Sequence, residues 1–279
     1  MVQTINFMEK NMSKKLAVIG VGNMAKSIIS GIKKSNIGVS EFYLYDVNPE
    51  QYTSLLGDGI IPSSSIKEAV DSADCVLLSV KPQNFPEVMS EIKNVPSSTE
   101  KLYITIAAGI TTDYIGEILN TKNIVRVLPN LPMVISRGVS AICYNDNVSE
   151  ADFDFVVDVF ESSGSIIKID ESDMNKTIGV TSSSPAYVFK FIKAICDGAL
   201  AQGLPEDRLV ETVCDMIIGS AELIKSGYGT PENMVKAVAS KGGTTEKALE
   251  TLDKYEFEKI ITEAMLACTK RADELGQIK

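Results

Sequence analysis

The sequence predicts an α/β fold, a doubly wound and mostly parallel sheet, followed by an all-α domain. Three observations carry this prediction: short β-rich runs alternate with helical patterns up to about residue 168, a glycine-rich turn follows the first run, and strand patterns end beyond residue 171. We therefore divide the chain into residues 14–168 and 169–279. Residues 1–13 are expected to form a flexible N-terminal extension.

The elements follow one another in the order that such a fold requires. Five apolar runs predict the strands of the parallel sheet, at residues 16–19, 42–45, 75–80, 102–106 and 124–128. Two more candidate strands, 139–144 and 165–169, flank a helical segment at 149–162 and extend the sheet. Further on, apolar residues recur at helical spacing, and the stretch 188–199 is apolar nearly all round, which indicates a helix buried in a helical core or a subunit interface.

Composition narrows the possible functions. The chain has 279 residues, 44% of them hydrophobic, and its 27 Lys and Arg against 37 Asp and Glu give a net charge of -10 without a dense basic run. Nucleic acid and membranes are therefore not expected partners. The five cysteines are scattered without C-x-x-C spacing, so we expect reduced thiols in a cytoplasmic protein and no metal site. The absence of histidine excludes a His-based acid or triad.

A glycine fingerprint lies between the first strand and the first helix. Gly20-x-Gly22-x-x-Ala25 opens the helix, and Asp46 ends the second strand, which is the arrangement of a dinucleotide site. Asp46 is expected to bond a ribose 2′-hydroxyl and to repel a 2′-phosphate, which favours NADH over NADPH; the alternative is an ordinary solvated carboxylate. The predicted cofactor-binding residues here are Gly20, Val21, Gly22, Asn23, Met24, Ala25 and Asp46.

Other strand ends are expected at the same crevice, because ligands of open α/β sheets bind at the carboxyl ends of the strands. These add Val80, Lys81, Pro82, Ala107, Ala108, Gly109 and Asn130 to the predicted cofactor-binding residues. Two alternatives stay open: Lys81 as a surface residue of a turn, and Asn130 as a structural turn residue.

A second glycine pair precedes the helical run that begins near residue 244. Gly242-Gly243-Thr244-Thr245 would present backbone N–H groups at the positive end of a helix, where a carboxylate binds well. The alternative is a glycine turn with a threonine cap.

From about residue 15 onwards the sequence resembles the pyrroline-5-carboxylate reductase family. The resemblance rests on Gly20-x-Gly22-Asn23-Met24, Val80-Lys81-Pro82, Ala107-Ala108-Gly109, Arg126-x-x-Pro129-Asn130-x-Pro132, Gly179-Val180-x-x-Ser183-Ser184-Pro185-Ala186-Tyr187 and Ser240-x-Gly242-Gly243-Thr244-Thr245. It implies a Rossmann domain, an all-helical C-terminal dimerisation domain, and NAD(P)H-dependent reduction of 1-pyrroline-5-carboxylate to L-proline, the last step of proline biosynthesis. The expected assembly is a homodimer or a larger assembly of dimers.

The resemblance also implies roles for individual residues. The backbone of Gly243, Thr244 and Thr245 would seat the substrate carboxylate, and the Thr245 hydroxyl would contact the ring nitrogen as the catalytic group. The substrate-binding residues carried over are Val180, Ser240, Gly243, Thr244 and Thr245. Lys241, Tyr228 and Leu131 stand where the family usually has Pro, often Glu and commonly Thr, which leaves room for an altered substrate preference.

Two other functions are weighed against this one. A β-hydroxyacid dehydrogenase shares the layout but needs a helix lysine, and neither Lys176 nor Lys190 lies in that family's pattern. A non-catalytic dinucleotide sensor would not need Gly242 to Thr245. Reduction of a protonated imine suits a chain without histidine, because the protein need only orient the ring and make one hydrogen bond at nitrogen.

Overall fold

The structure is a computed structural model that describes residues 13–277, so the prediction for residues 1–13 falls almost entirely outside the described residues. The chain divides into two compact units. The first contains the chain up to Ser183 and from Ala267 onwards, and the second is Ser184–Leu266. The first unit thus includes residues beyond the expected boundary at 168/169, because the segment after residue 168 packs on the sheet.

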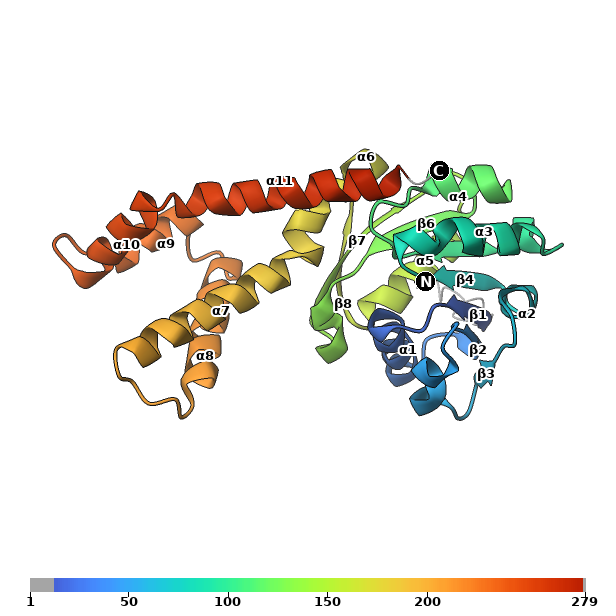
Figure 1. Cartoon of the computed structure of the whole chain (residues 1–279), viewed down its shortest axis with the longest axis horizontal. Helices are drawn as coiled ribbons and strands as arrows, with labels where there is room; N and C mark the ends of the chain where they lie inside the picture. Colours follow the sequence, from blue (N-terminus) through green and yellow to red (C-terminus); the bar gives the residue numbers. More distant parts are fainter. Residues whose placement is uncertain (1–12, 278–279) are drawn as a thin grey trace, which may run out of the picture. The chain divides into compact units, whose positions relative to one another are not determined.

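An eight-stranded sheet forms the centre of the first unit (Figure 1). Its order is β3-β2-β1-β4-β5-β6-β7-β8, and only β6 and β7 pair antiparallel. The strands are β1 (Lys14–Ile19), β2 (Val39–Tyr45), β3 (Ile60–Pro62), β4 (Cys75–Leu78), β5 (Leu102–Thr105), β6 (Ile124–Leu128), β7 (Gly138–Tyr144) and β8 (Gly164–Lys168). The predicted fold class is confirmed. The short edge strand β3 was not predicted, since three residues ending in proline carry too little pattern.

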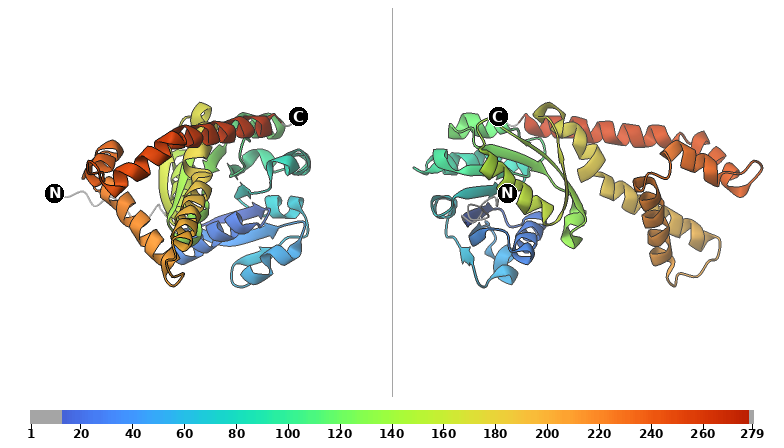
Figure 2. Two further views of the ribbon diagram at one scale, coloured as in Figure 1. Left: turned by 60° about the vertical axis from the view of Figure 1, so that its left-hand side comes forward. Right: turned by 180° about the vertical axis from the view of Figure 1, so that it is seen from behind.

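Helices cover both faces of the sheet (Figures 1 and 2). One face packs on α1 (Asn23–Ser35) and α5 (Glu150–Glu161), the other on α2 (Ile66–Asp71), α3 (Phe85–Lys93) and α4 (Thr112–Leu119). The central strands are buried on both sides, so successive residues alternate between two apolar clusters. Short 3-10 helices are η1 (Pro49–Leu55), η2 (Pro82–Asn84), η3 (Ser98–Glu100) and η4 (Leu131–Ile135).

After β8 the chain forms α6 (Glu171–Thr177), which continues into a π-helical turn, η5 (Ile178–Ser182). Met174 and Ile178 pack into a third apolar cluster with Leu128 and with Ala272 from the last turns of α11 (Phe257–Gly276). The end of α11 therefore belongs to the first unit. π-helical turns are rare and frequently mark functional positions.

The second unit is helical, as predicted, and contains α7 (Ser184–Ala201), α8 (Leu209–Lys225), α9 (Pro231–Val238), α10 (Thr244–Lys254) and the first part of α11. Its aromatic residues Phe191 and Phe257 lie with ring centroids 6.5 Å apart. Many of its large apolar side chains are exposed in the single chain, among them Phe189, Met216 and Ile260. Within residues 13–277, no helix is both long and apolar enough to cross a membrane.

Candidate functional site

Hydrogen bonds around Gly20 join the carboxyl ends of three neighbouring strands. The Gly20 N–H donates to the Tyr45 carbonyl of β2 over 2.8 Å, and the Ser79 hydroxyl, after β4, donates to the Gly20 carbonyl. Gly20 has φ +88°, and a Cβ there would lie 2.8 Å from a Val80 methyl carbon. Only glycine fits this position without strain.

A cleft of about 670 Å³ opens beside this turn. It is lined by Ile19, Gly20, Gly22, Asn23, Tyr45, Asp46, Val47, Gln51, Ile66, Ser79, Val80, Lys81, Gln83, Asn84, Glu87, Val88 and Glu91. A Cβ on Gly22 would meet no atom within 4 Å, so the backbone of the turn faces open space. The N–H groups of Asn23, Met24 and Ala25 at the start of α1 find no acceptor within residues 13–277. Such a helix start suits a phosphate.

Asp46 lies directly after β2, at the edge of this cleft. Its Oδ2 accepts the Val21 N–H over 2.7 Å and its Oδ1 accepts the Asn48 N–H over 2.9 Å. The carboxylate is therefore held by backbone groups on both sides, and each oxygen keeps a lone pair for a further donor such as a ribose hydroxyl. The residues present therefore fit a dinucleotide.

The cleft brings together only part of the predicted cofactor-binding set. Gly20, Gly22, Asn23, Asp46, Val80 and Lys81 line it, whereas Val21, Met24, Ala25, Pro82, Ala107, Ala108, Gly109 and Asn130 do not. Val21 and Ala25 are buried in the apolar cluster of one sheet face, with Met24 packed against it. The turn at Ala107 to Gly109 lies at the end of β5, and Gly109 is packed against the last turn of α11. For the whole predicted set, whether or not it lines the cleft, contact with a cofactor stays a prediction.

Asn130 is engaged within the protein. Its Oδ1 accepts the Val139 N–H at the start of β7, and its Nδ2 donates to the Thr181 carbonyl in the π-helical turn. The buried amide thus joins the turn after β6 to two other elements. This is the structural role that the sequence left open as the alternative.

Sequence reasoning missed several polar residues of the cleft. Gln51 comes from η1 and accepts a hydrogen bond from Lys26 Nζ over 3.0 Å, while Gln83 and Asn84 come from η2. Glu87 and Glu91 lie one turn apart on α3, so both carboxylates face the cleft. For Gln83 and Asn84 the available signal was the short distance from the end of β4, whereas Glu87 and Glu91 lie within α3, and no sequence motif marks them.

The second glycine motif forms the start of α10 in the other unit. Gly242 has φ +74° and Gly243 is the N-cap residue. The Gly243 N–H donates to the Ser240 carbonyl over 2.9 Å, and the Gly242 N–H donates to Glu246 Oε2 over 2.7 Å. Within the described chain, the N–H groups of Thr244 and Thr245 meet no acceptor. The free donors of the predicted carboxylate seat are thus those of the two threonines.

The remaining predicted substrate-binding residues, and the positions that depart from the family pattern, are exposed to solvent. Val180 projects from the π-helical turn and is exposed, and Ser240 is exposed as well. Lys241, Tyr228 and Leu131, where the sequence departs from the family pattern, are all exposed. None of the five cysteines forms a disulfide bond in the described chain, and no cluster of three acidic or cysteine side chains among the described residues is arranged to hold a metal ion.

Two family models match the chain. Residues 171–275 match the model described as pyrroline-5-carboxylate reductase dimerisation, and residues 15–109 match the model described as NADP oxidoreductase coenzyme F420-dependent. The first covers most of the helical part, and the second covers the glycine turn and the cleft.

The chain is also similar over nearly its whole length to several pyrroline-5-carboxylate reductases. The pyrroline-5-carboxylate reductase of Escherichia coli is 31% identical over 95% of this chain and 100% of its own length, and that of Vibrio alginolyticus is 34% identical over 95% and 98%. Among solved structures, the Plasmodium falciparum pyrroline carboxylate reductase with NADP bound has a TM-score of 0.86 at 28% identity, covering 96% of this chain and all of that chain. The Streptococcus pyogenes enzyme has a TM-score of 0.85 at 27% identity, with 94% and 98% covered.

The contacts of Asn130 generate a prediction about stability. Asn130→Ala should lower the free energy of unfolding by about 2 to 3 kcal/mol, because it removes two hydrogen bonds and leaves their partners unsatisfied. Urea unfolding measures this. The exposed Asn147→Ala, as control, should change stability by less than about 0.5 kcal/mol. Unchanged stability combined with weakened cofactor binding would instead make Asn130 a cofactor ligand.

Proposed function

The chain belongs to the pyrroline-5-carboxylate reductase family, and from this we propose that it reduces 1-pyrroline-5-carboxylate to L-proline with NAD(P)H, as the last step of proline biosynthesis. The observation that carries the proposal is the open start of α10. It offers two free N–H groups next to the Thr245 hydroxyl, which suits a small imino acid with a carboxylate. A dinucleotide sensor does not require this seat, and a dehydrogenase of hydroxyacids would also need a helix lysine, for which neither Lys176 nor Lys190 lies in the pattern of that family.

We propose that the cleft at the end of β1, β2 and β4 binds the dinucleotide. The start of α1 and the Gly22 backbone would hold the pyrophosphate, and Asp46 would accept from the ribose hydroxyls. When bound, the cofactor supplies a hydride. The turn at Ala107 to Gly109 would border its nicotinamide half, because that turn follows β5, the next strand in the sheet.

Thr245 would be the catalytic residue. Reduction turns the C=N bond into CH–NH: carbon receives the hydride, and nitrogen carries one proton that arrives with the iminium form of the substrate. The protein therefore needs no strong acid, and the Thr245 hydroxyl would orient the ring through one hydrogen bond at nitrogen. The Thr244 and Thr245 N–H groups would hold the carboxylate, with Ser240 and Gly243 shaping the turn and Val180 contributing an apolar contact.

The working molecule is a dimer, as for the family whose dimerisation model matches residues 171–275. The exposed apolar side chains of α7, α8 and α11 support this, because a second copy would cover them. We further propose that each active site combines the Gly20 turn of one chain with the α10 start of its partner. A cytoplasmic location is proposed because none of the five cysteines forms a disulfide bond in the described chain.

The reaction is tested by following NADH absorbance with 1-pyrroline-5-carboxylate as substrate, and in a separate assay with NAD⁺ and 3-hydroxyisobutyrate. Turnover of the imine alone supports the proposal. Turnover of the hydroxyacid alone would assign the chain to the rival dehydrogenases, and no turnover with either would favour a sensor.

The position of Asp46 predicts a preference for NADH. Asp46→Ser should raise the ratio of NADPH to NADH catalytic efficiencies by about tenfold or more, or about 1.4 kcal/mol, since it removes the charge that repels a 2′-phosphate. Steady-state kinetics with both cofactors measure this ratio. Asp58→Ser removes an equal charge from an exposed position outside the cleft and should leave the ratio unchanged. A wild-type preference for NADPH would show that the carboxylate does not lie against the ribose.

The catalytic role of Thr245 predicts a loss of turnover without a loss of cofactor binding. Thr245→Ala should lower catalytic efficiency by about 10- to 100-fold, the size of one hydrogen bond in a closed site. Thr245→Ser keeps the hydroxyl and should retain most of the activity. If the alanine variant matches the wild type in kcat/KM, the threonine is only a helix-start residue.

A further inference from the structure

A buried arginine lies outside all of the chemistry described above. Arg126 is in β6 and only 1% exposed. Its Nη1 lies 2.9 Å from Glu171 Oε1, and its Nη2 donates to Asn175 Oδ1; both partners are on α6. A buried guanidinium without partners would be very costly, so these contacts fix its place. From this one residue two chains of contacts run to the same turn.

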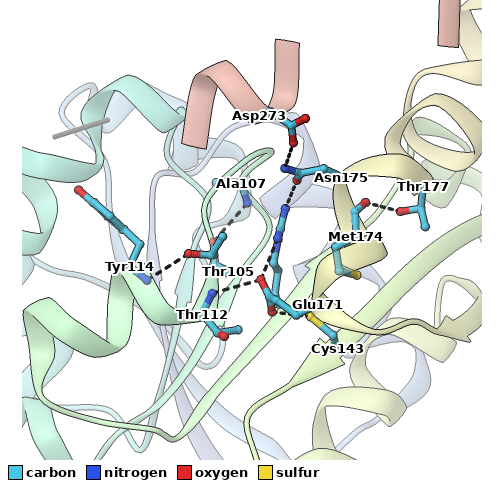
Figure 3. Close-up of polar contacts among 12 residues, drawn as sticks. Thr105, Ala107, Thr112, Tyr114, Cys143, Glu171, Met174, Asn175, Thr177 and Asp273 are labelled. Carbon is cyan, nitrogen blue, oxygen red and sulfur yellow. Dashed lines mark hydrogen bonds and ion pairs between the residues drawn. The ribbon is translucent and has the colours of Figure 1, made fainter. Parts of the chain in front are cut away.

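The first chain of contacts runs through Glu171 to the start of α4 (Figure 3). Glu171 Oε1 also accepts the Thr112 N–H over 3.3 Å, and Oε2 accepts from the Cys143 thiol over 2.8 Å. Burial, and the hydrogen bond to Glu171, raise the pKa of Cys143, so the thiol stays a donor. Thr112 is the first residue of α4 and lies three residues after Gly109, the last residue of the turn. Glu171 thereby caps the helix that leaves this turn.

The second chain of contacts runs through Asn175 to the end of α11. Asn175 Nδ2 donates to Asp273 Oδ1 over 2.8 Å (Figure 3). The same stretch of α11 packs directly behind the turn: a Cβ on Gly109 would lie 2.4 Å from the Ala272 carbonyl oxygen and 2.8 Å from the Gly276 nitrogen. Ala108 packs against the apolar cluster that contains Ala272. Asp273 therefore holds the backbone that supports Gly109 from the other side.

We propose that Arg126, Glu171, Asn175 and Asp273 form a positioning network that fixes the turn at Ala107 to Gly109 from two sides and so sets the affinity for the dinucleotide. None of the four is proposed to touch the cofactor. The inference rests on the proposed contact between this turn and the nicotinamide half. It goes beyond the family's reaction by assigning a task to four residues from three segments that are distant in sequence, namely β6, α6 and α11.

The network has features that a stability role alone does not require. Both branches end at a single turn, and one of them passes through the exposed residue Asp273, where a surface hydrogen bond adds little to stability. Oε1 of Glu171 accepts hydrogen bonds from both Arg126 and the Thr112 N–H. Removing the charge of Glu171 should therefore weaken the contact with Arg126 and the contact with the start of α4 together.

The experiment compares the full-length Glu171→Gln, Asp273→Ala and combined variants with the wild type. Three quantities are measured: the Kd for NADH from fluorescence, the KM for 1-pyrroline-5-carboxylate, and the melting temperature. We expect the Kd to rise about 5- to 10-fold for Glu171→Gln and about threefold for Asp273→Ala, with the KM for the imine changed less than about twofold. In the combined variant, the Kd for NADH should rise by less than the product of the two single increases, because both substitutions act on the same turn.

Asp173→Ala is the matched control. Asp173 lies on the same helix as Glu171 but forms an exposed ion pair with Lys176, so its removal should leave all three quantities unchanged. If both test variants have a lower melting temperature but an unchanged Kd for NADH, the network contributes to stability alone, and the proposal is overturned. If Glu171→Gln fails to fold, the Kd of the Asp273→Ala variant still tests the proposal, because Asp273 is exposed and its replacement should not prevent folding.

Gly109→Ala displaces the turn directly. It therefore tests whether the turn contacts the cofactor separately from whether the network positions the turn. If Gly109→Ala weakens NADH binding while the network variants do not, the network proposal fails and the cofactor assignment of the turn stands. If neither Gly109→Ala nor the milder Ala108→Val changes the Kd, the turn does not contact the cofactor, and that part of the proposed function fails with it.

Discussion

The hydrogen bonds around Gly20 are the constraint on which the rest of the site depends. Parallel strands end at one edge of a sheet, and there each chain must turn away without leaving backbone groups unpaired. In this protein the left-handed turn at Gly20 meets that demand by bonding to the end of β2 and accepting from Ser79 after β4, while Asp46 takes the next N–H. The same hydrogen bonds fix the turn so that the start of α1 faces the cleft. A binding cleft thus follows from how three strand ends are closed.

The chemistry is divided between the two compact units. The first unit contains the cleft proposed for the dinucleotide, and in it Arg126 pairs with Glu171, the contact from which the proposed network begins. The second unit supplies the start of α10 and a set of exposed apolar helices. Such surfaces are stable in water when another copy covers them, so the proposed substrate seat and the proposed dimer surface lie in the same unit.

How far the sequence predicts this molecule depends on how local each feature is. Gly20, Gly22 and Asp46 belong to one βαβ unit of fixed geometry, so spacing alone brings them to the cleft. For Asn130, which follows a strand, the sequence left cofactor binding and a structural role open. Its amide bonds to Val139 and Thr181, and periodicity carries no information about such partners.

The buried network lay beyond sequence reasoning for the same reason. Arg126 reads as a strand residue, and Glu171 and Asp273 as surface acids, until folding brings three distant segments together. The π-helical turn that carries Val180 was equally hidden, because helical periodicity does not distinguish an extra residue in one turn.

The claim that each site joins two chains has a direct test in an isolated heterodimer. One chain carries Gly22→Asp, which disables the dinucleotide cleft, and the other carries Gly243→Val with Thr245→Ala, which disables the substrate seat; two different tags allow the mixed dimer to be purified. If sites are shared, one of the two combines an intact cleft with an intact seat, so about half of the wild-type activity should return. A heterodimer no more active than either parent would mean that each chain holds its own complete site, and it would contradict the account.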